Sequence, residues 1–281
     1  MAGEPLPSFD LVVATVDRVA ELERLLASLE AQTHGDFRVL LVDQNEDDRL
    51  DQILREEHPF AVERLRSPRG LSRARNAALG SVRADLVAFP DDDCVLAPGL
   101  LEQVAGRFAN EPALDGLTGR AIGETGHSSR SWARDPARLT RENLWNRAIS
   151  FTIFLRATLA AQVGSFDEEL GLGAATPWAS GEEIEYLVRA LDAGARIEYD
   201  PAIVVTHPDK RVSPKALRSL GNRDGASVGY ILRKHGYPKR LVGAMLIRPI
   251  GGALLALARR DRAQAGFHLS TLRGRLLGYR S

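Results

Sequence analysis

The first 120 residues alternate short apolar runs with longer amphipathic stretches, and this alternation limits the fold more than any other feature of the chain. The runs 11–16 and 39–42 are apolar on both faces, as strands covered by helices on both sides must be. Residues 19–29 carry apolar side chains at three- and four-residue intervals, which predicts a helix with one stripe facing a sheet, and Asp17 is placed to cap it. We therefore predict an α/β fold with a mostly parallel central sheet flanked by helices.

The chain beyond residue 122 shows weaker periodicity. Residues 123–147 are rich in Gly, Ser, Arg and Asn, which predicts a long loop. Further on, apolar residues alternate with polar ones or recur at helical spacing, so we expect regular elements again. These are a strand at 149–155, a helix at 184–191 stopped by Gly194, and short strands at 197–199 and 203–205 that end at His207.

Composition excludes several classes of protein. The 281 residues are 44% hydrophobic and 26% charged, which excludes disorder, collagen and coiled coil as the main architecture. Cys94 is the single cysteine, so the chain has no internal disulfide framework. The acidic start of the sequence lacks the basic and apolar regions of a signal peptide, and we therefore expect a reducing, cytoplasmic compartment.

Charge divides the chain at residue 209. Residues 1–209 contain 21 Arg, no Lys and 35 acidic residues, a net charge of −14, whereas residues 210–281 contain 16 basic and 2 acidic residues, a net charge of +14. We therefore predict a domain at 1–209 and a basic, helical extension at 210–281. The basic charge of this extension predicts an anionic partner. The partner is a phosphate-bearing lipid surface, nucleic acid, or the acidic part of the same chain. Because the extension has no helix-turn-helix or zinc motif, no nucleic acid is expected.

Residues 241–258 form an apolar stretch within this extension, interrupted by Arg248, Pro249 and two glycines. A spanning helix needs about 20 apolar residues, so the stretch is short for one. Two interpretations stay open. The stretch is either a broken amphipathic helix lying in a bilayer interface, or part of a helical pair packed against the first domain. The first interpretation predicts a protein peripheral to the inner face of the cell membrane.

Polar residues follow the predicted strands of the first 120 residues. Ligands of parallel sheets gather at the carboxyl ends of the strands, so these residues predict one polar crevice. Each residue alone is equally a helix cap or a surface turn, and the recurrence at four strand ends favours a binding site. The residues are Thr15 and Asp17 after the first strand, Asp43 after the second, Arg75 and Asn76 after the third, and Asp91, Asp92 and Asp93 after the fourth.

The three consecutive aspartates carry the strongest chemical signal. In an extended segment alternate side chains share a face, so Asp91 and Asp93 are expected to project together while Asp92 points elsewhere. Two carboxylates on one face suit Mg²⁺ or Mn²⁺, which prefer oxygen ligands and add the oxygens of a bound diphosphate. The competing interpretation is a solvated acidic turn, which an apolar strand directly before the aspartates disfavours.

Seven short segments occur along the chain in a defined order, and they include the strand-end residues named above. They are VVATVDR, LVDQNEDD, GLSRARNAALG, VAFPDDDC, VGSFDEEL, GEEIEYLVRALDAGARIEYDP and VVTHP. Their order and spacing resemble family 2 of the glycosyltransferases, and the resemblance covers roughly residues 9–209. It implies the GT-A fold, which binds a nucleotide-diphosphate sugar with a divalent metal, and glycosyl transfer with inversion at the anomeric carbon.

The resemblance assigns the strand-end residues to a nucleotide-sugar donor. It implies that Thr15 and Asp17 contact the nucleotide, and that Asp43 contacts the base, commonly uracil in this family. Arg75 with Asn76 matches an Ala-Arg-Asn element near the nucleotide, and Asp92 is assigned to the donor with them.

The resemblance also implies a metal site and a cofactor. Asp91 matches the family's first aspartate, which contacts ribose or metal, and Asp93 matches the aspartate that binds the metal. His207 matches a late histidine that completes the metal shell in some members. The implied cofactor is Mn²⁺ or Mg²⁺, and an imidazole ligand suits Mn²⁺ better.

The general base is sought in the segment GEEIEY, which occupies the place of the family's Gly-Glu-Asp element. The aspartate usually assigned as base is replaced here by Glu183, a departure of one methylene. Either Glu183 or Glu182 is the base, and because adjacent helical residues point about 100° apart, both are not expected to face the acceptor. We favour Glu182 slightly. Trp178 is interpreted equally as a platform for an acceptor sugar and as a packing residue.

The expected function is that of a metal-dependent, inverting glycosyltransferase of the hexosyltransferase type, acting in polysaccharide or glycoconjugate biosynthesis. Its expected partners are a nucleotide-sugar donor, with a UDP-sugar favoured, and a hydroxyl of a glycan, lipid-linked or small-molecule acceptor. The alternative is a catalytically inactive nucleotide-sugar-binding or membrane-peripheral scaffold, which the change at Glu183 motivates. A nucleotidyltransferase is disfavoured because the first turn lacks a glycine-rich phosphate loop.

Overall fold

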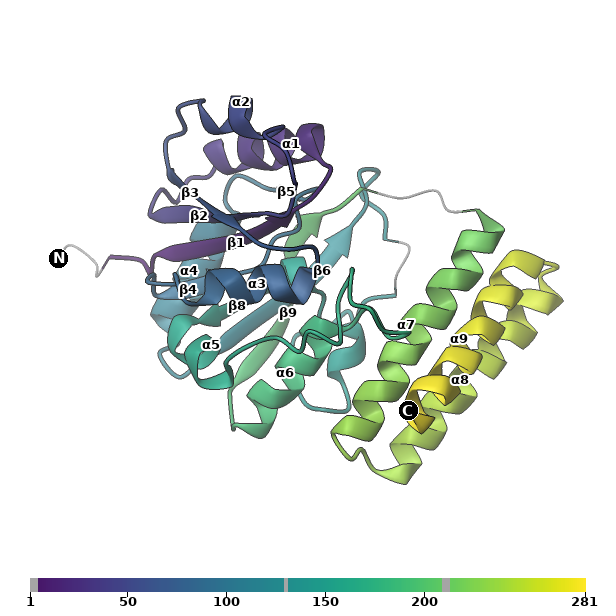
Figure 1. Cartoon of the computed structure of the whole chain (residues 1–281). Coiled ribbons are helices and arrows are strands. Elements are labelled where there is room, and N and C mark those ends of the chain that lie inside the picture. The colour runs from purple at the N-terminus through teal and green to yellow at the C-terminus, as the bar shows by residue number, and fades with distance from the viewer. Residues whose placement is uncertain (1–4, 129–130, 209–212) are drawn as a thin grey trace. The chain divides into compact units, whose positions relative to one another are not determined.

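The computed structural model describes residues 5–128, 131–208 and 213–281 (Figure 1). These residues form two compact units. The first contains residues 5–69, 73–128, 131–166 and 186–208, and the second contains residues 70–72, 167–185 and 213–281. The second unit thus combines the described part of the predicted extension with residues 70–72 and 167–185. The boundary predicted between residues 209 and 210 lies outside the described residues.

A nine-stranded mixed sheet forms the centre of the first unit. Its order is β3-β2-β1-β4-β8-β6-β9-β5, with β7 paired to β9. Strands β3, β2, β1 and β4 run parallel, as do β6 and β9, whereas β8, β5 and β7 are antiparallel to their neighbours. The strands are β1 Phe9–Thr15, β2 Phe37–Asp43, β3 Ala61–Arg66, β4 Leu86–Ala88, β5 Val95–Leu96, β6 Gly116–Ile122, β7 Ala137–Arg138, β8 Ile153–Arg156 and β9 Ile197–Thr206.

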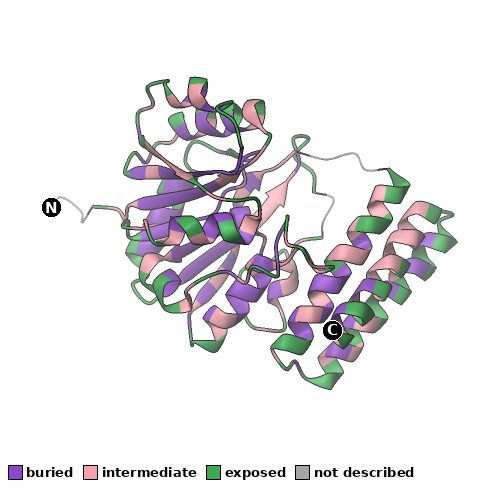
Figure 2. Cartoon of the chain, viewed as in Figure 1, coloured by how far each residue is buried: buried purple, intermediate pink, exposed green. Residues whose placement is uncertain are grey.

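Both faces of this sheet are covered, which explains the uniformly apolar strands. Leu11 and Val13 join the core cluster with the apolar stripes of α1 (Val19–Glu30) and α4 (Leu100–Asn110), while Val12 between them is equally buried. Figure 2 shows the central strands as almost entirely buried. The remaining α-helices before residue 208 are α2 Asp51–Leu54, α3 Leu71–Leu79, α5 Ala157–Val163 and α6 Glu182–Asp192, and 3₁₀ turns lie at Leu144–Asn146 and Ser150–Thr152.

Three local predictions were wrong. Arg18, not Asp17, is the N-cap residue of α1, and no side chain caps that helix. The predicted strand at 149–155 begins with a 3₁₀ turn, Ser150–Thr152, before β8. The two predicted strands 197–199 and 203–205 are one strand, β9, because its partner β6 shifts register and so accommodates the residues between them.

Three long helices make up most of the second unit: α7 Pro214–Lys234, α8 Lys239–Ala258 and α9 Arg262–Arg280 (Figure 1). The Ser213 and Asp261 side chains cap α7 and α9 by accepting hydrogen bonds from the backbone N–H of Ala216 and Gln264. Helix α7 lies directly on α9 because glycines let the two backbones approach closely. A Cβ at Gly221 would lie 2.6 Å from the carbonyl oxygen of Phe267.

Helix α8 runs without a break through Pro249, so the predicted broken helix is wrong. Proline has no N–H, which leaves the carbonyl of Met245, four residues earlier, without its helical partner. The Arg275 guanidinium of α9 donates a hydrogen bond to that carbonyl oxygen. Among the described residues, α8 alone is long and apolar enough to cross a membrane by length and composition, a test that core helices of soluble proteins also pass.

Residues 167–185 supply acidic partners for the C-terminal end of α7. The Lys234 ammonium lies 2.7 Å from Asp167 and 2.9 Å from Glu185, whose side chain is fully buried. His235 lies 3.1 Å from the same Glu185 carboxylate. Part of the basic charge of the extension is therefore paired within the chain, as one interpretation of the charge division proposed.

Substitution of Gly278 by alanine tests the close contact of α7 and α9. A Cβ there would overlap the carbonyl oxygen of Ala226, so we expect the variant to lose about 1–3 kcal/mol of unfolding free energy. Gly251→Ala on α8 is the matched control, because no atom lies within 4 Å of its added Cβ. It should gain about 0.5–1 kcal/mol through helix propensity. Urea unfolding followed by circular dichroism measures both, and equal stability of the two variants would refute the close contact.

Candidate active site

The carboxyl ends of the parallel strands bring the first group of predicted residues together in the first unit. Thr15 at the end of β1 lies in register with Asp43 at the end of β2, which in turn lies beside Arg66 at the end of β3. Thr15 and Asp43 are both buried. The predicted polar crevice thus begins as a row of three neighbouring side chains.

Asp43 is held on both of its carboxylate oxygens. Oδ1 accepts hydrogen bonds from the backbone and side-chain amides of Asn45, at 2.9 and 2.8 Å. Oδ2 accepts two from the Arg64 guanidinium, at 2.9 and 2.6 Å, and lies 3.1 Å from Arg66. A carboxylate offers about four acceptor positions, so the partners already present occupy the acceptor capacity of Asp43.

Asp17 follows β1 in a left-handed backbone conformation, with φ of 59°. Its N–H donates to the side-chain oxygen of Asn45 at 2.7 Å, which joins the turns after β1 and β2. Its two carboxylate oxygens pair with Arg49 at 2.8 Å and Arg69 at 2.7 Å. The structure therefore places Asp17 at the strand ends with two guanidiniums.

The three consecutive aspartates are buried or half-buried, and guanidiniums offset their mutual repulsion. Arg18 donates to Asp92 and to Asp93, at 2.7 Å each. Arg75 lies 3.3 Å from Asp91. Burial raises the pKa of Asp92, and the charge of Arg18 acts in the opposite direction. Asp92 thus points to Arg18, which it shares with Asp93.

His207 reaches these aspartates through the pairing of two distant strands. Val95 of β5 lies opposite Thr206 of β9 in an antiparallel pair, which brings the residues next to them in the chain side by side. The His207 Nε2 atom lies 3.1 Å from Asp93 Oδ1, and its ring stacks on Phe151 at 4.9 Å. Three possible ligand atoms, one each from Asp91, Asp93 and His207, lie within 4.8 Å of one another.

These three residues fit a hard divalent cation. The His207 Nδ1 atom lies 3.1 Å from the carbonyl oxygen of Pro208, which only accepts hydrogen bonds, so the neutral ring carries its proton on Nδ1. Nε2 then directs a lone pair toward the Asp93 carboxylate. This arrangement is favourable when a cation lies between the two atoms or when the ring is protonated. Hydrogen bonding of the second ring nitrogen to a carbonyl is typical of metal-bound histidines.

Arg75 and Asn76 lie on α3 and contact the chain before α6. Arg75 is 2% exposed, and its guanidinium lies over the rings of Phe89 and Phe166 at 5.8 and 5.5 Å. The Asn76 amide makes two hydrogen bonds with the backbone of Phe166, at 2.7 and 3.0 Å. Asn76 therefore fixes the backbone at Phe166, and Arg75 carries the charge that meets Asp91.

The two candidate bases begin α6, and both belong to the second unit. Glu182 is 4% exposed and packs against Gly171, where an added Cβ would lie 3.5 Å from its carboxyl carbon. Glu183 is half-buried. Trp178 stacks on Tyr230 at 4.9 Å, so one face of its ring serves packing.

Cys94 directly follows the aspartates and is fully buried. Burial raises the pKa of its thiol well above the ordinary value, and the charges of Asp91 and Asp93 act in the same direction. The thiolate is the reactive form of cysteine, so Cys94 is a packing residue and not a nucleophile.

Sequence reasoning did not single out three residues that the structure brings to this site. Arg18 pairs with two of the aspartates, the Ser150 hydroxyl lies 3.4 Å from Asp91, and Phe151 supports the His207 ring. Arg18 belongs to the first of the seven segments and directly follows Asp17. A basic residue just after a predicted strand could have been recognised in the sequence as a candidate site residue. Ser150 and Phe151 had no such signal, because they were expected in a strand.

Comparison with known proteins decides the family. Residues 10–163 match the family model described as Glycosyl transferase family 2, which is more than half of the chain. The chain belongs to this family. Membership confirms the resemblance to this family, and the match contains the first four of the seven segments.

Two curated relatives are similar to this glycosyl transferase family 2 chain in sequence. A pre-mycofactocin glycosyltransferase of Mycobacterium tuberculosis is 27% identical over 209 residues, which cover 70% of this chain and 42% of the relative. An uncharacterized glycosyltransferase of Haemophilus influenzae is 29% identical over 105 residues, 37% of this chain and 36% of the relative. The chain therefore spans less than half the length of either relative.

Solved structures of glycosyltransferases share the fold and confirm the predicted GT-A class. The mannosyltransferase PcManGT from Pyrobaculum calidifontis, solved with GDP-Man and Mn²⁺, has a TM-score of 0.65 at 14% identity, covering 98% of this chain and 88% of that one. TarS 1–349 of S. aureus, solved with UDP-GlcNAc, has a TM-score of 0.60 at 17% identity, covering 95% and 90%.

Proposed function

We propose that this chain is a metal-dependent, inverting glycosyltransferase of the hexosyltransferase type, in which residues 1–209 form the transferase domain. The observation that carries the proposal is the group Asp91, Asp93 and His207, whose ligand atoms converge beyond the strand ends. This is where a parallel sheet binds its ligand and where a diphosphate needs a divalent cation. The fold is also that of proteins solved with UDP-GlcNAc and with GDP-Man and Mn²⁺.

Asp91, Asp93 and His207 would hold Mn²⁺ or Mg²⁺. A cation bound there would stabilise the negative charge that develops on the departing nucleoside diphosphate. Thr15, Asp17 and Asp43 stand at the neighbouring strand ends, where we place the nucleotide, with Arg75, Asn76 and Asp92 on the donor side. Both carboxylate oxygens of Asp43 already have hydrogen-bond partners. We therefore expect the nucleobase of the donor to contact Asp43, Arg64 and Asn45 together. A UDP-sugar remains the favoured donor.

The transfer itself is a single displacement. The acceptor oxygen forms a bond to the anomeric carbon while the bond from that carbon to the diphosphate oxygen breaks, which inverts the anomeric centre. A carboxylate takes the acceptor proton as the new bond forms. We assign this base to Glu182, with Glu183 as its competitor. The acceptor class is a hydroxyl of a glycan, lipid-linked glycan or small molecule, in polysaccharide or glycoconjugate biosynthesis.

Thermal unfolding with nucleotides and metals tests the donor site directly. UDP, GDP, dTDP and ADP are each added with and without Mn²⁺ or Mg²⁺. We expect one nucleotide, UDP first, to raise the melting temperature when the metal is present, since a ligand at about 100 times its Kd adds about 2.7 kcal/mol of stability. The matching sugar nucleotides then serve for hydrolysis and transfer assays. The absence of any shift would refute the donor site.

A second function is favoured by one specific observation. Glu183 stands where the family usually has the aspartate base, and such a change is expected in a nucleotide-sugar-binding or membrane-peripheral scaffold that has lost catalysis. The same assays separate the two proposals. Metal-dependent stabilisation by a nucleotide, together with no turnover of any donor, would favour the scaffold. As part of either proposal, we place the protein in the cytoplasm, with residues 210–281 toward an anionic membrane surface at the inner face of the cell membrane.

A further inference from the structure

The exposed apolar side chains of the chain gather on two helices of the second unit. Within the described residues ten large apolar side chains are exposed, and eight of them lie on α8 and α9. Single exposed leucines are ordinary on soluble proteins, whereas apolar side chains gathered on neighbouring helices mark an interaction surface. The eight are Ile247, Ile250, Leu254, Leu255 and Leu257 on α8 and Leu269, Leu276 and Leu277 on α9.

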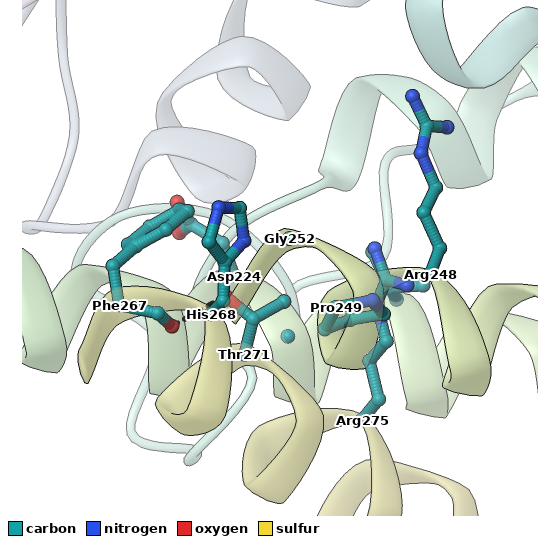
Figure 3. A pocket seen from close by; sticks show the side chains of 10 residues that line it. Asp224, Arg248, Pro249, Gly252, Phe267, His268, Thr271 and Arg275 are labelled. Carbon is teal, nitrogen blue, oxygen red and sulfur yellow. Dashed lines mark hydrogen bonds between the residues drawn. The ribbon is translucent and has the colours of Figure 1, made fainter. Parts of the chain in front are cut away.

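A cavity beside these helices shows which way their side chains point. Its volume is about 450 Å³, and α7, α8 and α9 together form its wall (Figure 3). Gly252 of α8 and Arg275 of α9 line the cavity. Leu254 and Leu277 follow them by two residues, a turn of about 200° around each helix, and so face away from the cavity. Leu255 differs, because it follows Gly252 by three residues and stands on the cavity side of α8.

The apolar side chains that face away from the cavity form one surface, because α8 and α9 lie side by side and antiparallel. Arg275 donates a hydrogen bond to the Met245 carbonyl oxygen. An added Cβ on Gly252 would lie 2.6 Å from the His268 ring. Seven residues forward on α8 thus correspond to seven residues back on α9. We call this surface the outward apolar face, and it consists of Ile247, Ile250, Leu254, Leu257, Leu269, Leu276 and Leu277.

Basic residues surround the outward apolar face. Residues 239–281 contain nine basic residues and one acidic residue, Asp261. Eight of the nine are exposed, and in the described part of the chain none of these eight forms an ion pair with a carboxylate. Arg273 lies within the α9 part of the face, between Leu269 and Leu276 in the sequence. Others stand near the helix ends, at Lys239, Arg240, Arg259, Arg260, Arg262 and Arg280.

Charge and apolar area together favour an anionic bilayer over a second copy of the chain. Two outward apolar faces in contact would bring arginines without acidic partners against one another, and like charges across an interface cost free energy. The acidic first unit of another copy would supply opposite charge, but within its described residues Val95 is the single exposed large apolar side chain. A bilayer interface accepts leucines among its acyl chains and presents phosphates to the guanidiniums beside them.

We propose that the outward apolar face binds the interface of an anionic membrane, with α8 and α9 lying in the plane of the bilayer surface. This rests on the membrane part of the proposed function and deepens it by naming the surface and its orientation. Helix α8 does not span the bilayer, because Val242, Met245 and Ala253 on its other side are buried in the helical unit. The cavity faces away from the bilayer and takes no part in the contact.

Vesicle sedimentation of the full chain tests the charge of the face. Vesicles of phosphatidylcholine alone are compared with vesicles of phosphatidylcholine and phosphatidylglycerol in equal parts. We expect the wild type to bind the anionic vesicles at least about tenfold more tightly, and Arg273→Gln to bind them about fivefold more weakly than the wild type, because one charge beside the phosphates is lost.

Arg248→Gln is the matched control for this change. Arg248 is an equally exposed class of arginine in the same unit, but it lines the cavity on the far side of α8. The width of the helix, about 10 Å, exceeds the distance of about 8 Å over which salt screens a charge, so binding should stay within about twofold of the wild type. Equal binding of the wild type to both vesicles, or a loss in Arg248→Gln as large as in Arg273→Gln, would overturn the proposal.

Leu254→Ser tests the apolar part of the face, and Leu255→Ser is its control one position along the same helix. The two side chains are 64% and 53% exposed, so neither change opens a hole in the bundle. They point about 100° apart, and only Leu254 belongs to the face. We expect at least about fivefold weaker binding for Leu254→Ser and binding within about twofold of the wild type for Leu255→Ser, at equal helix content by circular dichroism. Equal loss in both would contradict the orientation proposed here.

Light scattering of the wild type and Leu254→Ser separates the bilayer from a second copy. A wild-type dimer that Leu254→Ser dissociates, without vesicle binding, would assign the face to self-association and overturn the proposal. The nucleotide-dependent rise in melting temperature is measured on the same variants and should be unchanged. A wild type that responds to nucleotide without binding vesicles refutes this proposal alone, whereas vesicle binding without a nucleotide response refutes the donor site alone.

Discussion

Replacing Asp93 with asparagine should lower the transferase rate by about a thousand-fold, because one ligand of the metal that stabilises the leaving diphosphate is lost. Asp93 is 4% exposed and lies 3.1 Å from the Nε2 of His207. The amide keeps the shape of the side chain, so the fold should persist. The rate is measured with the donor found by thermal unfolding, and the metal response by the rise in melting temperature with Mn²⁺.

Asp92→Asn is the matched control for this change. It removes the same charge from the same Arg18 guanidinium but leaves the ligand atoms of Asp91, Asp93 and His207 in place. We expect the Mn²⁺ response to persist in Asp92→Asn and to vanish in Asp93→Asn. A metal response and a rate within tenfold of the wild type in Asp93→Asn would show that the metal site lies elsewhere.

Glu182→Gln should lower the rate by about a hundred- to ten-thousand-fold, the contribution usual for a general base. An amide nitrogen and oxygen cannot take the acceptor proton, whereas the shape of the side chain is unchanged. Glu182 is buried and lies next to Gly171, where an added Cβ would be 3.5 Å from its carboxyl carbon. Initial rates at saturating donor, with donor affinity measured separately, isolate the chemical step.

Glu183→Gln is the control for the base, one position along the same helix. Adjacent helical side chains point about 100° apart, so only one of the two is expected to face the acceptor hydroxyl. We expect Glu183→Gln to keep the transfer rate within about tenfold of the wild type. A loss of this size is expected for a residue that contacts the substrate but does not take its proton. A larger loss in Glu183→Gln than in Glu182→Gln would move the base to Glu183, and equal loss would show that one of them acts through the other.

The sheet was predictable because its signal is local. Uniformly apolar runs followed by a helical stripe such as Leu22, Leu25 and Leu29 are properties of consecutive residues, and they appear as β1, β2 and α1 in the structure. The prediction failed at Asp17, whose local sequence is compatible with two roles, a helix cap and an ion-pair partner. Asp17 was placed as a cap, but Arg49 and Arg69 occupy its carboxylate and α1 begins without a side-chain cap.

The same limit applies to α8. Pro249 and its neighbouring glycines predict an interruption when only the helix itself is considered, because the proline leaves one carbonyl unpaired. Arg275, 30 residues away from Met245, supplies the missing donor and the helix continues. A sequence-based argument has no means to find that partner.

The sequence by itself determined the order of strands and helices, the division of charge and the polar residues at the strand ends. Each of these features depends on residues that are neighbours in the sequence. Only the tertiary structure decided which of those residues meet. The pairing of β5 with β9 brings His207 to Asp93 across 114 positions of the chain, and Arg18 reaches Asp92 and Asp93 across 74 and 75. Contacts over such separations depend on strand register and helix packing, which arise from the whole chain.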